Sequence, residues 1–361
     1  MADLMTSSWE FSSLESQYKD FRAPAVSFTV GGTDLVKKGA ALQSVEAVLS
    51  LDGASSVCVV FNDCYDVKNG SYDSTLKSAA VLGKTVELSL GYQSSLKKVF
   101  KGYLSNVRIT ASADEGYTME FVSLDARRLM MADNHHSREY KIKNYSDAVS
   151  EILKRYARLC SAKVDATSEN MQNGLLWQRG SDYDFITREL IGSGRADREF
   201  FISVDNAYFR KPRSVSAPVI TLKPGGGLIA ITRDAEYLNE NIEVLGFDPA
   251  SGKPVSGKAA AKSTDQLSDA LGGAGEWFIS DPSCVSASQA AGWAGAVARN
   301  AIRKSQKAEI RCIGLPEIIP GRFLKIDRVD SLVNRKYYIT RVTHRFDGSG
   351  FLTEIETEGW E

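Results

Sequence analysis

The sequence predicts an α+β fold that is mainly β: two related, tube-like antiparallel β-barrel modules with an α+β insert between them. Three observations support this prediction. Residues 315–359 contain three short strand patterns in succession, residues 25–125 contain six more, and helical periodicity replaces the alternation between the two regions. With 361 residues, the chain is long enough for two to three domains.

The strand pattern is clearest near the end of the chain. Residues 323–326 and 337–346 are rich in β-forming side chains, and a turn with two glycines leads into a return strand over residues 351–358. In this return strand Phe, Thr, Ile and Thr alternate with Leu and three Glu. One face of the hairpin should therefore be packed and the other wet.

A weaker copy of this hairpin pattern lies upstream, at residues 102–125. In both hairpins a valine is followed, after a short turn, by a glycine that opens the return strand: Val107 and Gly116 in the first, Val342 and Gly350 in the second. Duplication of one β-module explains the similarity, and so does the general likeness of amphipathic hairpins.

The first part of the chain is expected to be a polar arm, or a short helix before Pro24, followed by the first barrel. The arm covers residues 1–24, and the first module covers residues 25–125, in which Gly-containing turns separate the strands. The expected strands are residues 25–30, 44–51, 56–61, 85–91, 99–109 and 117–124.

The insert is expected over residues 126–212. A short helix at its start is followed by a helix that Ser146 caps, and Ser181 begins a third helix with a capping-box-like pattern. A hairpin of two strands, residues 199–204 and 207–210, closes the insert.

The second module is expected over residues 213–361. Residues 249–275 are rich in small and polar side chains, which predicts a flexible surface loop or extension. A helix over residues 286–306, capped by Ser286, precedes the last strands. The other expected strands are residues 219–222, 228–233, 241–247 and 307–313.

Composition excludes several function classes. The net charge is −1, so no basic field favours nucleic acid, and no apolar run is long enough to span a bilayer. The N-terminus lacks the pattern of a signal peptide. Five scattered cysteines without a CxxC pair are typical of free thiols in a reducing cytoplasm.

No motif for catalysis or cofactor binding is recognisable. His135 and His136 lie in a polar segment and lack a third ligand at a suitable spacing, so we expect no metal site. His344 is expected on a strand face or at an interface, and the glycines of residues 224–227 are expected to form a turn. The sequence therefore favours a structural or interaction protein without cofactor or enzymatic activity.

Several degenerate stretches, in this order, resemble the baseplate hub family of contractile tails, also called the phage late control D family. They are Asp125-Ala126-Arg127-Arg128-Leu129, Ser181-Asp182-Tyr183-Asp184-Phe185-Ile186, residues 200–204 and 207–212, and the closing hairpin 337–358 with His344. The resemblance covers residues 25–358 and extends to the N-terminal part of the valine-glycine-repeat spike proteins of type VI secretion.

The resemblance implies a non-enzymatic baseplate hub of a phage tail, a tailocin or a related injection device. It implies a homotrimer whose six barrels form a pseudo-six-fold ring between a trimeric spike and the hexameric inner tube. It further implies contacts with tube-initiator proteins, other baseplate proteins and the tape measure protein, with assembly in the bacterial cytoplasm. Because the chain ends after the second module, the spike is expected to be a separate protein. The interface residues that we expect on the barrel walls are Tyr103, Val107, Tyr338, Val342, His344 and Phe351.

Two other classes remain open from the residues alone. A tail-associated cell-wall hydrolase would use a pair of carboxylates that the spacing does not single out, or a metal at His135 and His136. A β-rich carbohydrate-binding module would need an exposed platform of aromatic side chains.

Overall fold

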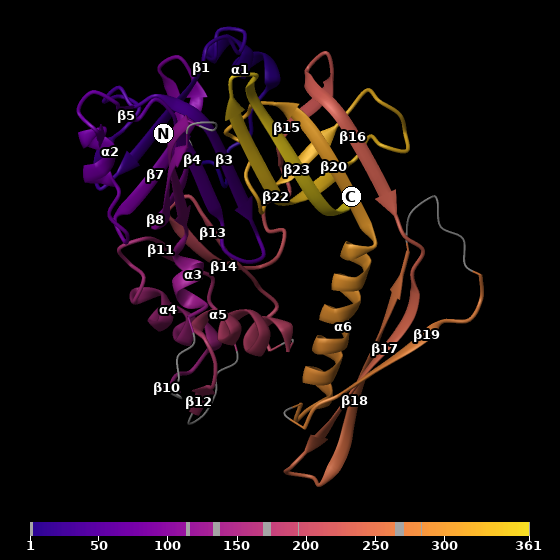
Figure 1. The fold of residues 1–361 in the computed structure, drawn as a ribbon. Helices are drawn as coiled ribbons and strands as arrows, with labels where there is room; N and C mark the ends of the chain where they lie inside the picture. The colour runs from indigo at the N-terminus through magenta and orange to yellow at the C-terminus, as the bar shows by residue number, and fades with distance from the viewer. Residues whose placement is uncertain are drawn as a thin grey trace.

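Two β-modules lie side by side at one end of the molecule, and two smaller parts extend from them in the same direction (Figure 1). The first module is indigo to purple in the figure, and the second is mainly orange to yellow. The structure, a computed structural model, describes residues 3–112, 116–132, 138–168, 175–193, 195–263, 271–282 and 284–360.

The first module is a sheet with the strand order β2-β1-β7-β8-β9-β4-β3. Strands β1, β3, β4 and β9 bury alternate side chains, as the sequence pattern predicts, and the rings of Phe28, Phe61 and Phe121 pack together inside the module. The elements are β1 (Pro24–Val30), β2 (Thr33–Asp34), β3 (Leu42–Ser50), β4 (Ser56–Phe61), β5 (Tyr65–Asp66), β6 (Ser71–Tyr72), α2 (Ser74–Ala79), β7 (Thr85–Tyr92), β8 (Ser95–Ser112) and β9 (Gly116–Leu124).

The second module closes into a barrel with the order β22-β21-β15-β16-β20-β23, because β23 also pairs with β22. The barrel is not purely antiparallel as expected: β15 runs parallel to β21 and, for a short stretch, to β16. The first residue of β15, Pro218, pairs with the first residue of β21, Phe323, so both strands begin at the same end of the barrel and run in the same direction. The strands are β15 (Pro218–Pro224), β16 (Gly227–Ala235), β20 (Gln306–Ile313), β21 (Phe323–Ile326), β22 (Lys336–Asp347) and β23 (Gly350–Trp360).

The two modules form one continuous sheet. Strand β3 pairs with β22 from Val45 opposite Phe346 to Ser50 opposite Arg341, which gives 13 strands among the described residues. A single hydrophobic core runs through both modules, and the rings of Tyr92 and Phe351 lie 5.8 Å apart across it. The mainly β class of the fold is confirmed, and the modules are joined by both backbone pairing and core packing.

The N-terminal segment contains a short helix, which is one of the two forms expected for it, and it packs against both modules. Its helix, α1 (Phe11–Gln17), buries Leu14, and Trp9 bridges to Ile220 of β15. The ring of Tyr18 lies 5.1 Å from that of Tyr92 in the first module.

The insert has the expected mixture of helices and strands. Ser181 caps α5 as expected, but the chain continues from α5 as a π-helix. The helix expected from Ser146 begins two residues earlier, because Asn144 takes the N-cap position and its N–H donates to Asp147 over 3.0 Å. The elements are α3 (Ala126–Met130), β10 (Arg138–Lys141), α4 (Tyr145–Lys154), β11 (Ser161–Val164), β12 (Leu175–Gln178), α5 (Asp182–Asp184), η1 (Phe185–Gly192), β13 (Glu199–Ser203) and β14 (Asn206–Arg210).

An arm of one sheet and one helix extends from the second module beside the insert (Figure 1). It consists of β17 (Asn239–Asp248), β18 (Lys253–Lys262), β19 (Gly275–Ser280) and α6 (Ala287–Lys304), and Ser286 caps α6 as expected. Residues 249–275 are expected as a mobile loop or an extension; the described part is an extension and not a loop, because β18 forms a ten-residue antiparallel pair with β17. The small residues of this segment serve helix packing: a Cβ on Gly257 would lie 2.1 Å from the backbone nitrogen of Ala291 in α6.

Candidate functional site: a charged face shared by both modules

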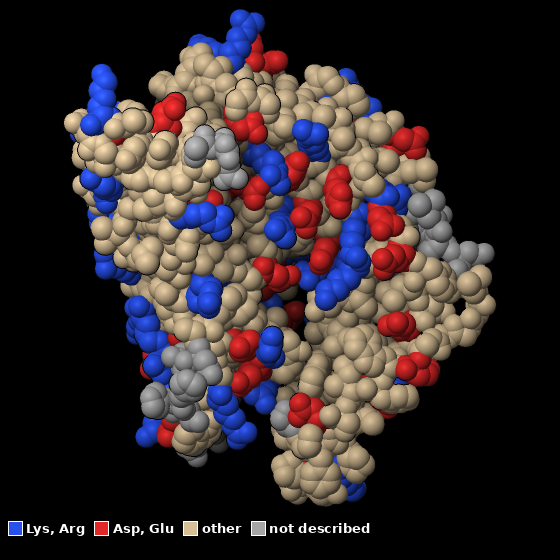
Figure 2. All heavy atoms as spheres, in the orientation of Figure 1, with Lys and Arg blue, Asp and Glu red and all other residues tan. Residues whose placement is uncertain are grey.

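The outward sides of β8, β9, β4, β3, β22, β23 and β20 form one face across both modules, which we call the charged face. Its side chains are mostly polar and half-buried or exposed, in contrast to the apolar inward side of the same strands. Figure 2 shows acidic and basic side chains intermixed over the part that belongs to the second module.

Cross-strand ion pairs hold the charged face together. Arg345 of β22 contacts Glu46 of β3, and its Nε lies 3.0 Å from Glu354 Oε2 of β23, so one guanidinium spans three strands and both modules. Arg341 pairs with Glu356 at 3.7 Å. Because these pairs are exposed, each contributes at most about 1 kcal/mol to stability, and they mainly set strand register and keep the face hydrophilic.

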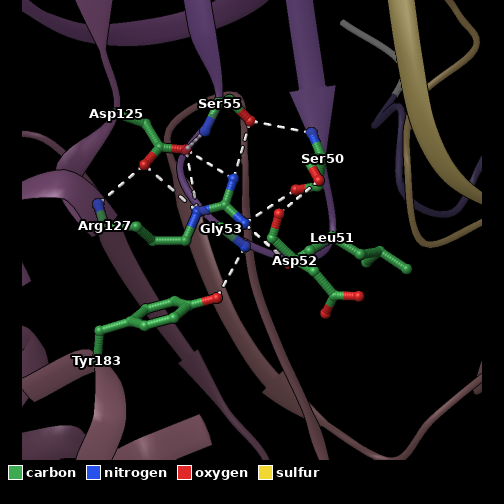
Figure 3. A network of polar contacts seen from close by, with 8 residues as sticks. All are labelled: Ser50, Leu51, Asp52, Gly53, Ser55, Asp125, Arg127 and Tyr183. Atoms are coloured by element: carbon green, nitrogen blue, oxygen red, sulfur yellow. Dashed lines mark hydrogen bonds and ion pairs between the residues drawn. The ribbon is translucent and has the colours of Figure 1, made fainter. Parts of the chain in front are cut away.

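A buried arginine joins the first module to the insert (Figure 3). The Arg127 side chain of α3 is fully buried, and its five N–H groups all donate. They reach the carboxylate of Asp125, the carbonyl oxygens of Ser50 and Leu51, and Ser55 Oγ, at 2.7–3.0 Å. The guanidinium therefore fixes the β3–β4 turn onto the first helix of the insert.

The same turn receives a second bond from the insert. The Gly53 N–H donates to the hydroxyl of Tyr183, in α5, over 2.8 Å. Figure 3 shows this bond beside the Arg127 cluster. The β3–β4 turn of the first module is thus held by two separate helices of the insert.

A second buried network joins the insert to the second module. Glu199 of β13 accepts hydrogen bonds from Arg210 Nε at 2.8 Å and from the Tyr338 hydroxyl at 2.6 Å. Arg210 also donates to the carbonyl oxygen of Gly321, at 2.6 Å. Burial raises the pKa of the Glu199 carboxyl, while the Arg210 guanidinium opposes that shift.

A third network joins the N-terminal segment to both modules. The Glu317 side chain is fully buried; it accepts a hydrogen bond from the Tyr18 hydroxyl at 2.6 Å and lies 3.6 Å from the Lys97 ammonium of β8. Burial raises the pKa of Glu317, and the Tyr18 bond and Lys97 counter it. Burial also raises the pKa of Tyr18, so this hydroxyl stays protonated and donates.

The three networks stand at the three junctions between parts of the chain. A buried ion pair loses its stabilising attraction when its geometry changes, because each ion then keeps its desolvation cost without its partner. The networks therefore oppose any change in the angle between the modules. This arrangement can hold a shaped surface; it does not bring a nucleophile and a base together.

The structure places the predicted interface residues in two groups. The side chains of Tyr338, Val342, His344 and Phe351 are buried within the chain, at 5% exposure or less. Any contact there would use other side chains of the same strands.

The other two predicted interface residues lie on β8 and are half-buried. Tyr103 packs against the core of the insert, and Val107 packs against the shared core of the modules. Beyond Val107, β8 carries Ile109, which is 55% exposed.

His344 is packed among side chains of the closing hairpin. Its Nδ1 lies 3.0 Å from Thr353 Oγ1, and its ring lies 5.8 Å from that of Phe351. Burial lowers the pKa of His344 to about 4, so the ring is neutral at physiological pH. His135 and His136 lie outside the described residues.

Metal and substrate sites are not evident in the described part of the chain. No three His, Cys, Asp or Glu side chains are grouped there to hold a metal ion. A small cavity where both modules meet the insert, lined by Phe100, Asp125, Ile202 and Pro320 among others, has about 10 Å³ of free volume, room for about one water molecule. No described helix is long and apolar enough to cross a membrane.

Sequence reasoning missed the buried charges that fix the modules. A signal exists for Glu317, because it is the one charged residue in the apolar run of residues 313–320. The Asp125 and Arg127 pair is visible as an acidic N-cap before a helix, but its burial depends on a turn far away in the sequence.

Comparisons with known proteins point to one fold. The family model described as the Alg8 N-terminal domain matches residues 23–348. No curated protein matches the sequence.

Three solved structures are similar over most of this chain. A 43 kDa tail protein of prophage MuSo2 from Shewanella oneidensis is 13% identical, with a TM-score of 0.68 over 93% of this chain and 98% of that one. A tail protein from Neisseria meningitidis is 11% identical, with a TM-score of 0.69 over 93% and 97%. An Escherichia coli component of the type VI secretion system, which exhibits structural similarity to the bacteriophage T4 tail proteins gp27 and gp5, is 12% identical, with a TM-score of 0.55 over 92% and 77%. The resemblance to tail and type VI secretion proteins is thus confirmed at the level of the fold.

Proposed function

The chain belongs to the family described as the Alg8 N-terminal domain and has the fold of phage tail proteins, and from this premise we propose that it is a baseplate hub of a contractile tail or a related injection device. In this role it is a structural component without enzymatic activity. It assembles in the bacterial cytoplasm and becomes part of a phage-like particle.

The observation that carries this proposal is the rigid union of two β-modules in one chain. The β3–β22 pairing and the shared core fix the two modules side by side, and the three buried networks hold their angle. Three such chains around a three-fold axis present six modules. A ring of this kind meets a hexameric inner tube on one side and a trimeric spike on the other.

The charged face supplies a surface suited to such a ring. It runs across both modules without interruption, so neighbouring chains can continue it around the axis. Its intermixed charges suit transient contact with a passing chain better than tight apolar docking. The tube, spike, tube-initiator, other baseplate and tape measure proteins are the proposed partners, and the strands of Tyr103, Val107, Tyr338, Val342, His344 and Phe351 are the proposed ring walls.

The native mass of the assembly tests this proposal. Light scattering after size exclusion is measured on the 39.5 kDa chain alone and with coexpressed tube and spike proteins from the same gene neighbourhood. We expect a trimer under at least one of these conditions, and six lobes in averaged electron micrographs. A strict monomer under every condition would overturn the hub and direct attention to zymography on peptidoglycan.

A further inference from the structure

The arm presents a sheet that α6 covers on one face only. On the other face Leu245 and Phe247 of β17 and Phe278 of β19 are 37%, 47% and 59% exposed. Trp277, whose side chain points to the opposite side of β19, is also 47% exposed. An edge strand with an exposed aromatic ring on each side is unusual in a monomer and marks a surface that a partner covers.

Both edges of this sheet lack a strand partner in the described part of the chain, and they differ in charge. The order is β18-β17-β19, so β18 and β19 are the two edges. Strand β18 carries three exposed lysines and no acid: Lys253, Lys258 and Lys262. Strand β19 carries Glu276, is followed by Asp281, and has no basic residue.

These charges favour one pairing over the others. Two β18 edges repel each other, as do two β19 edges, whereas β18 and β19 attract. Strand β18 runs antiparallel to β17, and β19 runs parallel to it. A β19 edge that meets the β18 edge of another copy in the same orientation therefore forms an antiparallel pair, which is the more stable kind.

The side chains of the two edges also fit in size. Strand β18 offers the small, exposed residues Ser256 and Ala260 on the face that α6 leaves open, where they pair with Leu245 and Asn241 of β17. These leave room for the ring of Phe278 from a neighbouring β19. The close approach of α6 to Gly257 explains why that position is a glycine, whereas Ala260 is exposed.

We propose that β18 of one copy pairs with β19 of the next, so that the three arms of the trimer form a closed ring of strands. This inference rests on the proposed trimer. The contact is heterologous, since it joins two different edges, and it closes when each copy is rotated by a third of a turn. The partner of the arm is thus a second copy of this chain.

Disulfide cross-linking tests the pairing directly. Within one copy, residues of β18 and β19 lie on opposite sides of β17, about 10 Å apart, which is two strand spacings. A disulfide requires Cα atoms less than about 7 Å apart, so a bond between these strands can form only between copies. The variants combine Ser256→Cys, Ala260→Cys or Lys262→Cys on β18 with Glu276→Cys or Ser280→Cys on β19, all with Cys58→Ser.

The expected result is a covalent trimer for at least one pair on a non-reducing denaturing gel, since these positions sample the whole edge. Each single-cysteine variant is the matched control and should stay uncross-linked, because like edges do not meet. A native trimer in which no pair cross-links, or in which single variants cross-link equally well, would overturn the arm pairing while leaving the hub intact. A chain that is monomeric under every condition removes both proposals.

Charge reversal gives an independent readout. Lys262→Glu and Glu276→Lys should each weaken the trimer, by up to about fivefold in its dissociation constant, and the double variant should recover most of the loss. Both side chains are exposed, so the monomer fold is expected to tolerate the changes. Losses that simply add in the double variant would contradict a contact between the two edges.

Discussion

The body of the molecule and its arm are held together by different physics. In the body, fully buried charges such as Arg127 and Glu317 sit at the junctions between modules, insert and N-terminal segment. In the arm, the described core consists of Ile242, Val244, Cys284 and four alanines. At Gly257 the backbone of β18 comes close to the backbone of α6, and no ion pair lies between them there. Directional bonds tolerate one arrangement, whereas apolar contacts between small residues tolerate several.

This difference fits the separate tasks proposed for the two regions. A ring that must match its neighbours on both sides needs a fixed angle between its two modules, which the buried networks supply. An arm that pairs with another copy needs free edges and an uncovered face. Substitutions in the body should therefore affect the whole fold, and substitutions in the arm should act locally.

The largest expected effect follows removal of the guanidinium in the body. Arg127→Met leaves the buried Asp125 carboxylate without its ion-pair partner and removes the bonds to Ser50, Leu51 and Ser55. We expect a loss of about 3–5 kcal/mol in the free energy of unfolding, measured by urea denaturation.

Two comparisons sharpen this prediction. Arg345→Met removes an exposed arginine of the charged face and should cost no more than about 1 kcal/mol. Asp125→Asn combined with Arg127→Met should cost less than Arg127→Met alone, because no unpaired charge remains buried. Equal losses in Arg127→Met and Arg345→Met would show that burial does not distinguish the two arginines.

The second prediction concerns low pH, which should lower the free energy of unfolding of the body. The pKa of His344 is about 4 in the fold, against about 6.5 in the unfolded chain, so only the unfolded chain binds the proton between these values. Stability is therefore complete above pH 6.5 and falls as the pH drops towards 4, by roughly 3 kcal/mol in total.

His344→Gln isolates this contribution. The variant should show a flatter fall in the free energy of unfolding between pH 6.5 and 4 than the natural chain. Glu199 and Glu317, whose pKa values are raised, act with the opposite sign, and their effect cancels when the two chains are compared. Parallel pH profiles for the two chains would refute the assignment.

The contrast between the body and the arm also separates the structure that the sequence predicts from the structure that it does not. The strands of the body follow from alternation: Phe351 to Thr357 are buried at every second position, as the pattern of β23 predicts. The arm departs from the loop expectation because its strand β18 consists mainly of Gly, Ala, Ser and Lys, residues that also compose flexible loops. What makes that segment a strand is contact with β17 and α6, which local composition does not encode.

The candidate site shows the same limit. The hairpins that carry Val107 and Val342 are predictable, since turn glycines and β-forming residues are local features. The pairing of β3 with β22 and the meeting of Arg127 with Ser50 join residues that are far apart in the chain. Such contacts depend on how the elements pack, so a single sequence contains no local pattern for them.

The smallest effect in this series is expected in the arm, at Gly257. A methyl group there would lie 2.1 Å from the backbone nitrogen of Ala291, so Gly257→Ala must push α6 away from β18. Overpacking of this kind costs about 1–3 kcal/mol, and we expect that loss in the arm alone. Gly275→Ala is the matched control, because its new methyl group would meet only ordinary contacts, the nearest at 3.7 Å.

Hydrogen exchange should show faster exchange in β17, β18 and α6 of Gly257→Ala, with the protection of β3 and β22 unchanged. Loss of protection in both regions would mean that the arm and the body unfold as one unit, and the distinction between their two kinds of packing would then have no consequence for stability.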